Sequence, residues 1–281
     1  MKRRKVDLLI LSDIHLGTYG CHAKELVKYL KSIQPDTLIL NGDIIDMWQF
    51  RKKYWPDSHT KVLKQIIGFM GRGTQIHYVT GNHDEMLRKF VGLELGNFRI
   101  VNKVKLLIDG KSAWIFHGDV FDVVMQHSKW LAKLGAIGYD TLILINRFVN
   151  YLAEKTGRGR ISLSKRIKNS VKSAVKFINN FEETAAEIAV KNNFDYVICG
   201  HIHQPEMRTI KTAEGSVEYL NSGDWIENLT SLEYHDGEWK IFRYNEDFVD
   251  EDYDDDSKPE DDMKVKELFN IMLTEFKVNV A

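Results

Sequence analysis

The stretch DLLILSDIH, residues 7–15, indicates the fold class of this chain. It is a short apolar run that ends in a polar cluster, and its length and composition are typical of a buried β-strand. Four more runs of this kind follow along the chain: TLILN (37–41), QIHYVT (75–80), SAWIFH (112–117) and DYVICG (195–200). The pattern predicts buried strands with polar side chains at their ends.

Helical segments alternate with the first three of these runs. Residues 21–33 and 60–72 carry apolar side chains at helical spacing, so the chain opens as strand, helix, strand, helix, strand. Such alternation favours parallel strands with helices on both faces of the sheet. Further on, residues 231–244 contain two alternating runs around Asp236 and Gly237, which predicts a β-hairpin. The expected fold class is α/β.

The composition is that of a folded globular protein. Of 281 residues 43% are hydrophobic, and 39 Lys and Arg balance 40 Asp and Glu, which excludes disordered, collagen-like and disulfide-scaffold proteins. The two cysteines, Cys21 and Cys199, are far apart in sequence, which favours a reducing compartment. The first apolar run is too short for a signal peptide or a membrane span. A cytoplasmic location is therefore expected.

The alternating pattern is interrupted once and then ends in a different kind of segment. We expect an α/β core over residues 1–120 and 190–245, a helical insertion over 121–189, and an acidic linker with a C-terminal helix over 246–281. The apolar part of the insertion, residues 136–152, is too short and too polar to span a bilayer. It is also too apolar to remain in water, so it must pack on something.

Charge is segregated along the chain. Residues 155–176 contain eight Lys and Arg and no acidic residue, whereas residues 247–262 contain ten Asp and Glu and a single Lys. The basic run is either a solvated helix face or an interaction surface. The acidic run cannot bury enough apolar surface to fold, so we expect a disordered linker there.

The polar clusters that follow the five strands contain metal-ligand residue types. In a parallel sheet these strand ends lie at the edge where open α/β folds bind ligands. Carboxylates, a carboxamide and up to five imidazoles suit Mn²⁺, Fe or Zn²⁺ better than Ca²⁺, and are too rich in nitrogen for Mg²⁺ alone. Together they are too many for one ion, and two ions about 3.5–4 Å apart clamp an in-line displacement at phosphorus. The residues concerned are Asp13, His15, Asp43, Asn82, His83, His117, His201 and His203.

The order of these motifs, DxH, GDxxD, GNHD, HGD and GHxH, resembles that of the calcineurin-like metallophosphoesterase superfamily over about residues 6–245. The resemblance implies a four-layer αββα sandwich with a helical insertion that acts as a lid. It also implies two divalent ions, most simply Mn²⁺ with Fe or Zn²⁺ as alternatives. Asp43 bridges them in the implied ligand set, which is Asp13, His15, Asp43 and His203 on one ion and Asp43, Asn82, His117 and His201 on the other.

The same resemblance implies two catalytic residues that are not ligands. His83 matches the histidine that assists the leaving group or stabilises charge in the transition state, and Asp84 beside it is expected to orient the imidazole.

One branch of the superfamily resembles this chain in finer detail. The stretch LNGDIIDMWQF (40–50), the aromatic-rich RKKYWPD (51–57) and the insertion are similar to those of UDP-2,3-diacylglucosamine diphosphatases of lipid A synthesis, although that branch has GNRD where this chain has GNHD. The resemblance implies an acylated nucleotide-sugar substrate, cleaved to lipid X and UMP, and peripheral contact with the cytoplasmic face of the inner membrane. The predicted substrate-binding residues are Asp122, Leu144, Phe148, Arg158, Arg160, Lys165 and Arg166.

Three other functions are compatible with parts of this sequence. A soluble phosphatase or phosphodiesterase could use the same site on a phosphoprotein or a cyclic nucleotide, but it would not need an apolar insertion. A non-catalytic interaction module would be expected to have lost ligands, and none of the seven is missing. Nucleic-acid binding through the basic run is not expected, because aromatic residues are sparse within it.

Overall fold

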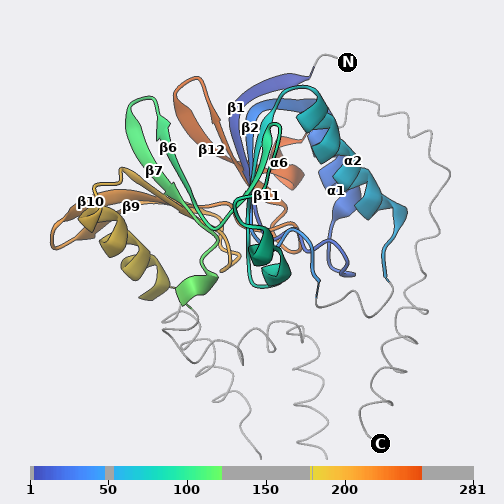
Figure 1. The fold of residues 1–281 in the computed structure, drawn as a ribbon. Helices are drawn as coiled ribbons and strands as arrows, with labels where there is room; N and C mark the ends of the chain where they lie inside the picture. Colours follow the sequence, from blue (N-terminus) through green and yellow to red (C-terminus); the bar gives the residue numbers. More distant parts are fainter. Residues whose placement is uncertain (1–2, 48–53, 122–177, 179, 249–281) are drawn as a thin grey trace, which may run out of the picture. The chain divides into compact units, whose positions relative to one another are not determined.

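The computed structural model describes residues 3–47, 54–121, 178 and 180–248 (Figure 1). The chain divides into two compact units, residues 1–247 and 248–281, and the described residues other than Phe248 belong to the first. The predicted substrate-binding residues lie outside the described residues, as do the rest of 122–177 and the acidic linker with its C-terminal helix. Within the described residues no helix is long and apolar enough to cross a membrane.

The first strands of the chain form a seven-stranded sheet. Its centre is parallel, with β1 (Arg4–Leu11), β2 (Ile33–Asn41), β3 (Gln75–Val79) and β5 (Phe98–Val101) side by side. Antiparallel strands lie outside them and give the order β12-β11-β1-β2-β3-β5-β4. These outer strands are β4 (Glu94–Leu95), β11 (Thr230–His235) and β12 (Glu238–Arg243).

The hairpin predicted near residue 236 is confirmed. Strands β11 and β12 pair antiparallel, with His235 opposite Glu238. The two turn residues between them, Asp236 and Gly237, have φ angles of 50° and 83°. Two successive residues with positive φ form a tight two-residue turn whose twist matches that of the flanking strands. Glycine at the second position adopts this conformation without strain.

Two helices accompany this sheet, α1 (Ala23–Ser32) and α2 (Asp57–Gly71), close to the predicted segments (Figure 1). In α1 the side chains of Leu26, Val27 and Leu30 are buried at helical spacing. Tyr29 on the same helix stacks on Phe242 of β12 at 4.3 Å and donates a hydrogen bond to Glu233 of β11 at 2.6 Å. These contacts hold α1 against the sheet.

A second sheet has the order β6-β7-β8-β10-β9. The strand ends were expected at the edge of a parallel sheet, and β7 and β8 lie in this second sheet, in agreement with the two sheets of the αββα sandwich that the resemblance implies. An apolar run shows that a strand is buried but does not reveal its neighbours. The strands are β6 (Val104–Ile108), β7 (Lys111–Ile115), β8 (Tyr196–Cys199), β9 (Glu206–Thr212) and β10 (Gly215–Asn221).

The two sheets pack face to face. Leu8, Ile10 and Ile39 of the first sheet share a buried cluster with Ile115 and Ile198 of the second. Because side chains alternate along a strand, the neighbours of Ile198 point to the opposite face.

That opposite face is covered by a helix over residues 180–191. Phe181, Ala185 and Ala189 of this helix pack against Val197 and Cys199 of β8, all of them fully buried. Two sheets flanked by helices are the α/β sandwich expected from the motifs. The helix packs on the core and extends across the boundary predicted at residue 189, because helical periodicity does not distinguish a core helix from an inserted one.

The described residues also form short helices outside the sheets: the 3₁₀ helices η2 (Glu85–Phe90) and η3 (Asp119–Phe121), and α6 (Tyr244–Asp247).

Candidate metal centre

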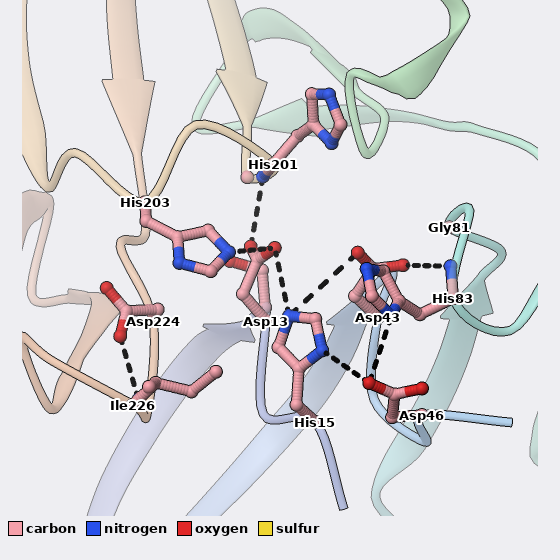
Figure 2. Close-up of polar contacts among 12 residues, drawn as sticks. Asp13, His15, Asp43, Asp46, Gly81, His83, His201, His203, Asp224 and Ile226 are labelled. Carbon is pink, nitrogen blue, oxygen red and sulfur yellow. Dashed lines mark hydrogen bonds and ion pairs between the residues drawn. The ribbon is translucent and has the colours of Figure 1, made fainter. Parts of the chain in front are cut away.

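Most of the predicted ligands come together where strands of both sheets end, and Figure 2 shows Asp13, His15, Asp43 and His203 facing one another. Both sheets contribute, since β1, β2 and β3 belong to the first and β7 and β8 to the second. Asp13 and His15 follow β1, Asp43 follows β2, Asn82 and His83 follow β3, His117 follows β7, and His201 and His203 follow β8.

Three groups of side chains are close enough to hold a cation, each with its ligand atoms within 4.8 Å of one another. They are Asp13, His15 and His203; Asp43, His117 and His201; and His15, Asp43 and His83. His203 Nε2 lies 3.1 Å from Asp13 Oδ1, and His117 Nε2 lies 3.2 Å from Asp43 Oδ2. Asp43 belongs to two of the groups, as expected for a carboxylate shared between two ions.

Several buried atoms of the cluster have no hydrogen-bond partner in the described part of the chain. They are Asp13 Oδ1, His15 Nε2, Asn82 Oδ1 and His117 Nε2. A buried polar atom without a partner costs about 1–3 kcal/mol, so four of them in one place would be unfavourable in a purely structural core. Oxygen and imidazole nitrogen atoms are suitable ligands for Mn²⁺, Fe and Zn²⁺. The residues therefore fit divalent cations.

Five of these residues have backbone conformations that are rare for side chains larger than glycine. Asp13, His15, Asp43, His201 and His203 have φ angles of 52°, 53°, 54°, 67° and 54°. Such left-handed residues cost of order 1–3 kcal/mol each and tend to cluster at functional sites.

The glycines beside the ligands make room for the ligands themselves. A Cβ atom on Gly81 would lie 2.2 Å from Asp43 Oδ1, and one on Gly42 would lie 2.4 Å from the ring of His117. Both distances are far below van der Waals contact, so only glycine fits.

Several groups that orient the ligands were not recognised in the sequence. The ring of His117 donates from Nδ1 to the Asn41 carbonyl at 2.9 Å, which leaves Nε2 facing Asp43. A metal-binding histidine is commonly fixed in this way through its other nitrogen. His59 of α2 accepts a hydrogen bond from the Gly17 backbone at 2.9 Å, just beyond His15. A single sequence does not show which backbone carbonyl or which helix residue contacts the loops that carry the ligands.

The electrostatic environment favours positive charge at the cluster. Burial by itself would raise the pKa of Asp13, but the nearby His203 and His117 lower it to about 2. Burial would likewise lower the pKa of His203, but the negative charge of Asp13 raises it to about 9. Buried carboxylates thus attract cations here, and a metal that binds to these groups must displace protons.

Asp46 contacts two of the histidines. Its Oδ2 lies 3.0 Å from His83 Nδ1 and 3.6 Å from His15 Nδ1, and the residue is only 2% exposed. Burial opposes a charged imidazole at His83, but the hydrogen bond to Asp46 and the charge of Asp43 raise the pKa of His83 above its ordinary value. Asp46 is the second aspartate of the GDxxD motif. The orienting role was expected of Asp84 instead, because Asp84 is adjacent to His83.

The expectation that Asp84 orients His83 is wrong. Asp84 is fully buried and accepts hydrogen bonds from the backbone of Gly81 at 2.6 Å, the backbone of Ile44 at 3.0 Å and the hydroxyl of Tyr78 at 2.7 Å. Side chains of consecutive residues usually diverge, so Asp84 points into the protein. Its contacts join the loops after β2 and β3.

We expect Asp84→Ala to destabilise the fold. Three donors lose their acceptor, so the free energy of unfolding should fall by about 3 kcal/mol or more, measured by urea denaturation. Asp36→Ala, at an exposed position of β2, is the matched control and should leave stability nearly unchanged. A variant at Asp84 with wild-type stability but little activity would restore the orienting role.

The fold and this set of donor atoms define a metal-dependent phosphoester hydrolase. Residues 6–205 match the family model for calcineurin-like phosphoesterases, so the chain belongs to that family. The family suggested by the motifs is thereby confirmed.

Relatives with curated names are similar over most of their length. A UDP-2,3-diacylglucosamine hydrolase of Blochmanniella pennsylvanica is 24% identical over 245 residues, which cover 82% of this chain and 93% of that protein. A protein of the same name from Aliivibrio fischeri is 21% identical over 244 residues, covering 82% and 95%. Among solved structures, an archaeal phosphodiesterase aligns over 84% of this chain and 98% of its own, with a TM-score of 0.40 and 15% identity.

Proposed function

We propose that the protein hydrolyses the diphosphate of UDP-2,3-diacylglucosamine to UMP and 2,3-diacylglucosamine 1-phosphate (lipid X). The observation that carries the proposal is the match to two hydrolases named for this substrate over 93% and 95% of their lengths. Family membership and the candidate ligands support the same chemistry.

The proposed ligands divide between two ions, with Mn²⁺ as the first choice for a mixed oxygen and nitrogen set. One would be held by Asp13, His15, Asp43 and His203, the other by Asp43, Asn82, His117 and His201. Divalent ions in such a site lower the pKa of water and neutralise charge on the phosphoryl oxygens.

His83 is proposed to protonate the leaving oxygen. Its Nδ1 faces Asp46 at 3.0 Å, and its side chain is 24% exposed, so Nε2 is the nitrogen available to substrate. Asp46 keeps the imidazole protonated and in one orientation, which makes it a positioning residue.

The rest of the proposal concerns the acyl chains and the location of the enzyme. The insertion, with Asp122, Leu144, Phe148, Arg158, Arg160, Lys165 and Arg166, would bind the acylated sugar and its phosphates. The protein would act in the cytoplasm, in peripheral contact with the inner membrane.

The proposal is tested by comparing substrates. Purified protein with Mn²⁺ is incubated with UDP-2,3-diacylglucosamine in detergent micelles, with bis(p-nitrophenyl) phosphate and with a phosphopeptide, and products are identified by mass spectrometry. We expect UMP and the acylated sugar phosphate, with a kcat/KM well above that for either soluble substrate. Faster hydrolysis of a soluble substrate would instead indicate a soluble phosphatase or phosphodiesterase.

A further inference from the structure

Large apolar side chains are exposed on one short stretch of the surface. Met86, Phe90 and Leu95 are 60%, 55% and 52% exposed, and Val91 and Leu93 are each 39% exposed. We call these five side chains the η2–β4 surface. Exposed apolar side chains scattered singly are ordinary, but a contiguous group usually marks an interaction site.

The backbone beneath the η2–β4 surface is held in place. Leu87 donates to the Asp84 carbonyl at 2.9 Å at the start of η2, and Gly92 donates to Ile100 at 2.9 Å. Strand β4 pairs with β5, with Leu95 opposite Phe98. The exposed side chains therefore project from ordered backbone that forms the edge of the seven-stranded sheet.

The η2–β4 surface follows the metal centre directly along the chain. Helix η2 begins directly after His83 and Asp84, and Arg88 of η2 forms an ion pair with Asp119 of η3. Val120 on η3 is itself 54% exposed. In Figure 1 the teal η2 and the light-green η3 lie toward the same end of the sheets.

The charge around the η2–β4 surface is positive. Residues 85–103 include Arg88, Lys89, Arg99 and Lys103 against Glu85 and Glu94, and Asp119 pairs with Arg88, which leaves a balance of 4 − 3 = +1. Lys89 and Lys103 are exposed, and neither forms an ion pair within the described part of the chain. Apolar side chains beside cationic ones are the combination that binds the interface of anionic bilayers.

We propose that the η2–β4 surface docks on an anionic lipid bilayer. Docking holds the metal centre, which lies at an edge of the sheets, close to the membrane. The inference deepens the proposed function, because an acylated substrate resides in a membrane. A soluble protein partner would not require both the exposed cations Lys89 and Lys103 and the five apolar side chains of the η2–β4 surface.

The test uses the full chain and two double variants. Phe90→Ser/Leu95→Ser removes the most apolar part of the η2–β4 surface. Ile67→Ser/Leu107→Ser is the matched control, since Ile67 on α2 and Leu107 on β6 are 66% and 75% exposed but lie outside it. Binding is measured by sedimentation with phosphatidylethanolamine/phosphatidylglycerol vesicles and with phosphatidylcholine vesicles, and folding by Tm.

We expect wild type and control to bind the anionic vesicles and to bind phosphatidylcholine weakly. The Phe90/Leu95 variant should lose about tenfold or more in partition coefficient with an unchanged Tm. Equal vesicle binding by both variants would overturn the proposal. A lowered Tm of the Phe90/Leu95 variant would also overturn it, because it would show that another part of the chain covers these side chains. A wild-type dimer that the Phe90/Leu95 variant dissociates would overturn it as well, because the surface would then be an interface between two copies.

The vesicle assay is independent of catalysis. If UDP-2,3-diacylglucosamine in micelles is not hydrolysed but the Phe90/Leu95 variant alone loses vesicle binding, the proposed function fails and the docking surface stands. If the substrate is hydrolysed and vesicle binding is the same for all three proteins, the docking surface fails and the proposed function stands.

Discussion

Asp43→Ala is expected to lower kcat by more than about 10³-fold even at saturating Mn²⁺. Asp43 belongs to two of the three candidate cation groups and lies 3.2 Å from His117 and 4.0 Å from His15. It also accepts a hydrogen bond from the His83 backbone at 2.8 Å. Removing this carboxylate takes one ligand from both proposed ions and frees the loop that carries His83. Metal analysis should show less than half of the wild-type content.

The control experiments separate loss of metal from loss of fold. Asp43→Asn keeps the side-chain shape and an oxygen acceptor for the His83 backbone, so it should fold while binding metal poorly. Asp36→Ala, at an exposed position of the strand that precedes Asp43, should retain full activity and metal content. A chelator should inactivate wild type, and added Mn²⁺ should restore it. If Asp43→Ala kept near-wild-type turnover, Asp43 could not bridge two ions.

The elements that sequence reasoning identified are those whose pattern is local. Strands β1, β2, β3, β7 and β8 each contain a short run of buried apolar residues, and each is followed by the residues that form the site. Parallel pairing then places these strand ends at one edge, so the gathering of carboxylates and imidazoles there could be predicted without knowing which sheet each strand joins.

Elements whose burial depends on the rest of the fold could not be predicted. Strand β9 is almost entirely exposed and reads EMRTIKT, which lacks the apolar run of a buried strand. The helix over 180–191 has a spacing that fits either an insertion or a core layer, and only its packing under β8 decides between them.

The roles of Asp46 and Asp84 illustrate the same distinction within the site. Asp84 is adjacent to His83 in sequence, but its carboxylate accepts hydrogen bonds from Gly81, Ile44 and Tyr78. Asp46 comes from the end of another strand and lies against the ring of His83. The role of each aspartate depends on the direction in which its side chain points. Adjacency in sequence does not reveal that direction.

His83→Ala is expected to lower kcat by about 10²–10⁴-fold, as loss of a general acid does, while metal content remains near that of wild type. The imidazole is partly exposed and is oriented by Asp46, so it can reach a substrate oxygen. His83 also lies within 4.8 Å of ligand atoms of His15 and Asp43. Metal analysis of the variant is therefore essential, because loss of an ion would make His83 a ligand.

Asp46→Asn then shows through which histidine Asp46 acts. Its carboxylate lies 3.0 Å from His83 Nδ1 but also 3.6 Å from Nδ1 of the proposed ligand His15. If Asp46 works by positioning His83, its loss should cost nothing further once His83 is absent, so the double variant should have the kcat of His83→Ala. Asp36→Asn serves as the control, since Asp36 is an exposed residue of β2 and should show no such coupling. Multiplied losses in the double variant, together with weaker metal binding, would show instead that Asp46 acts through His15 and holds the metal centre together.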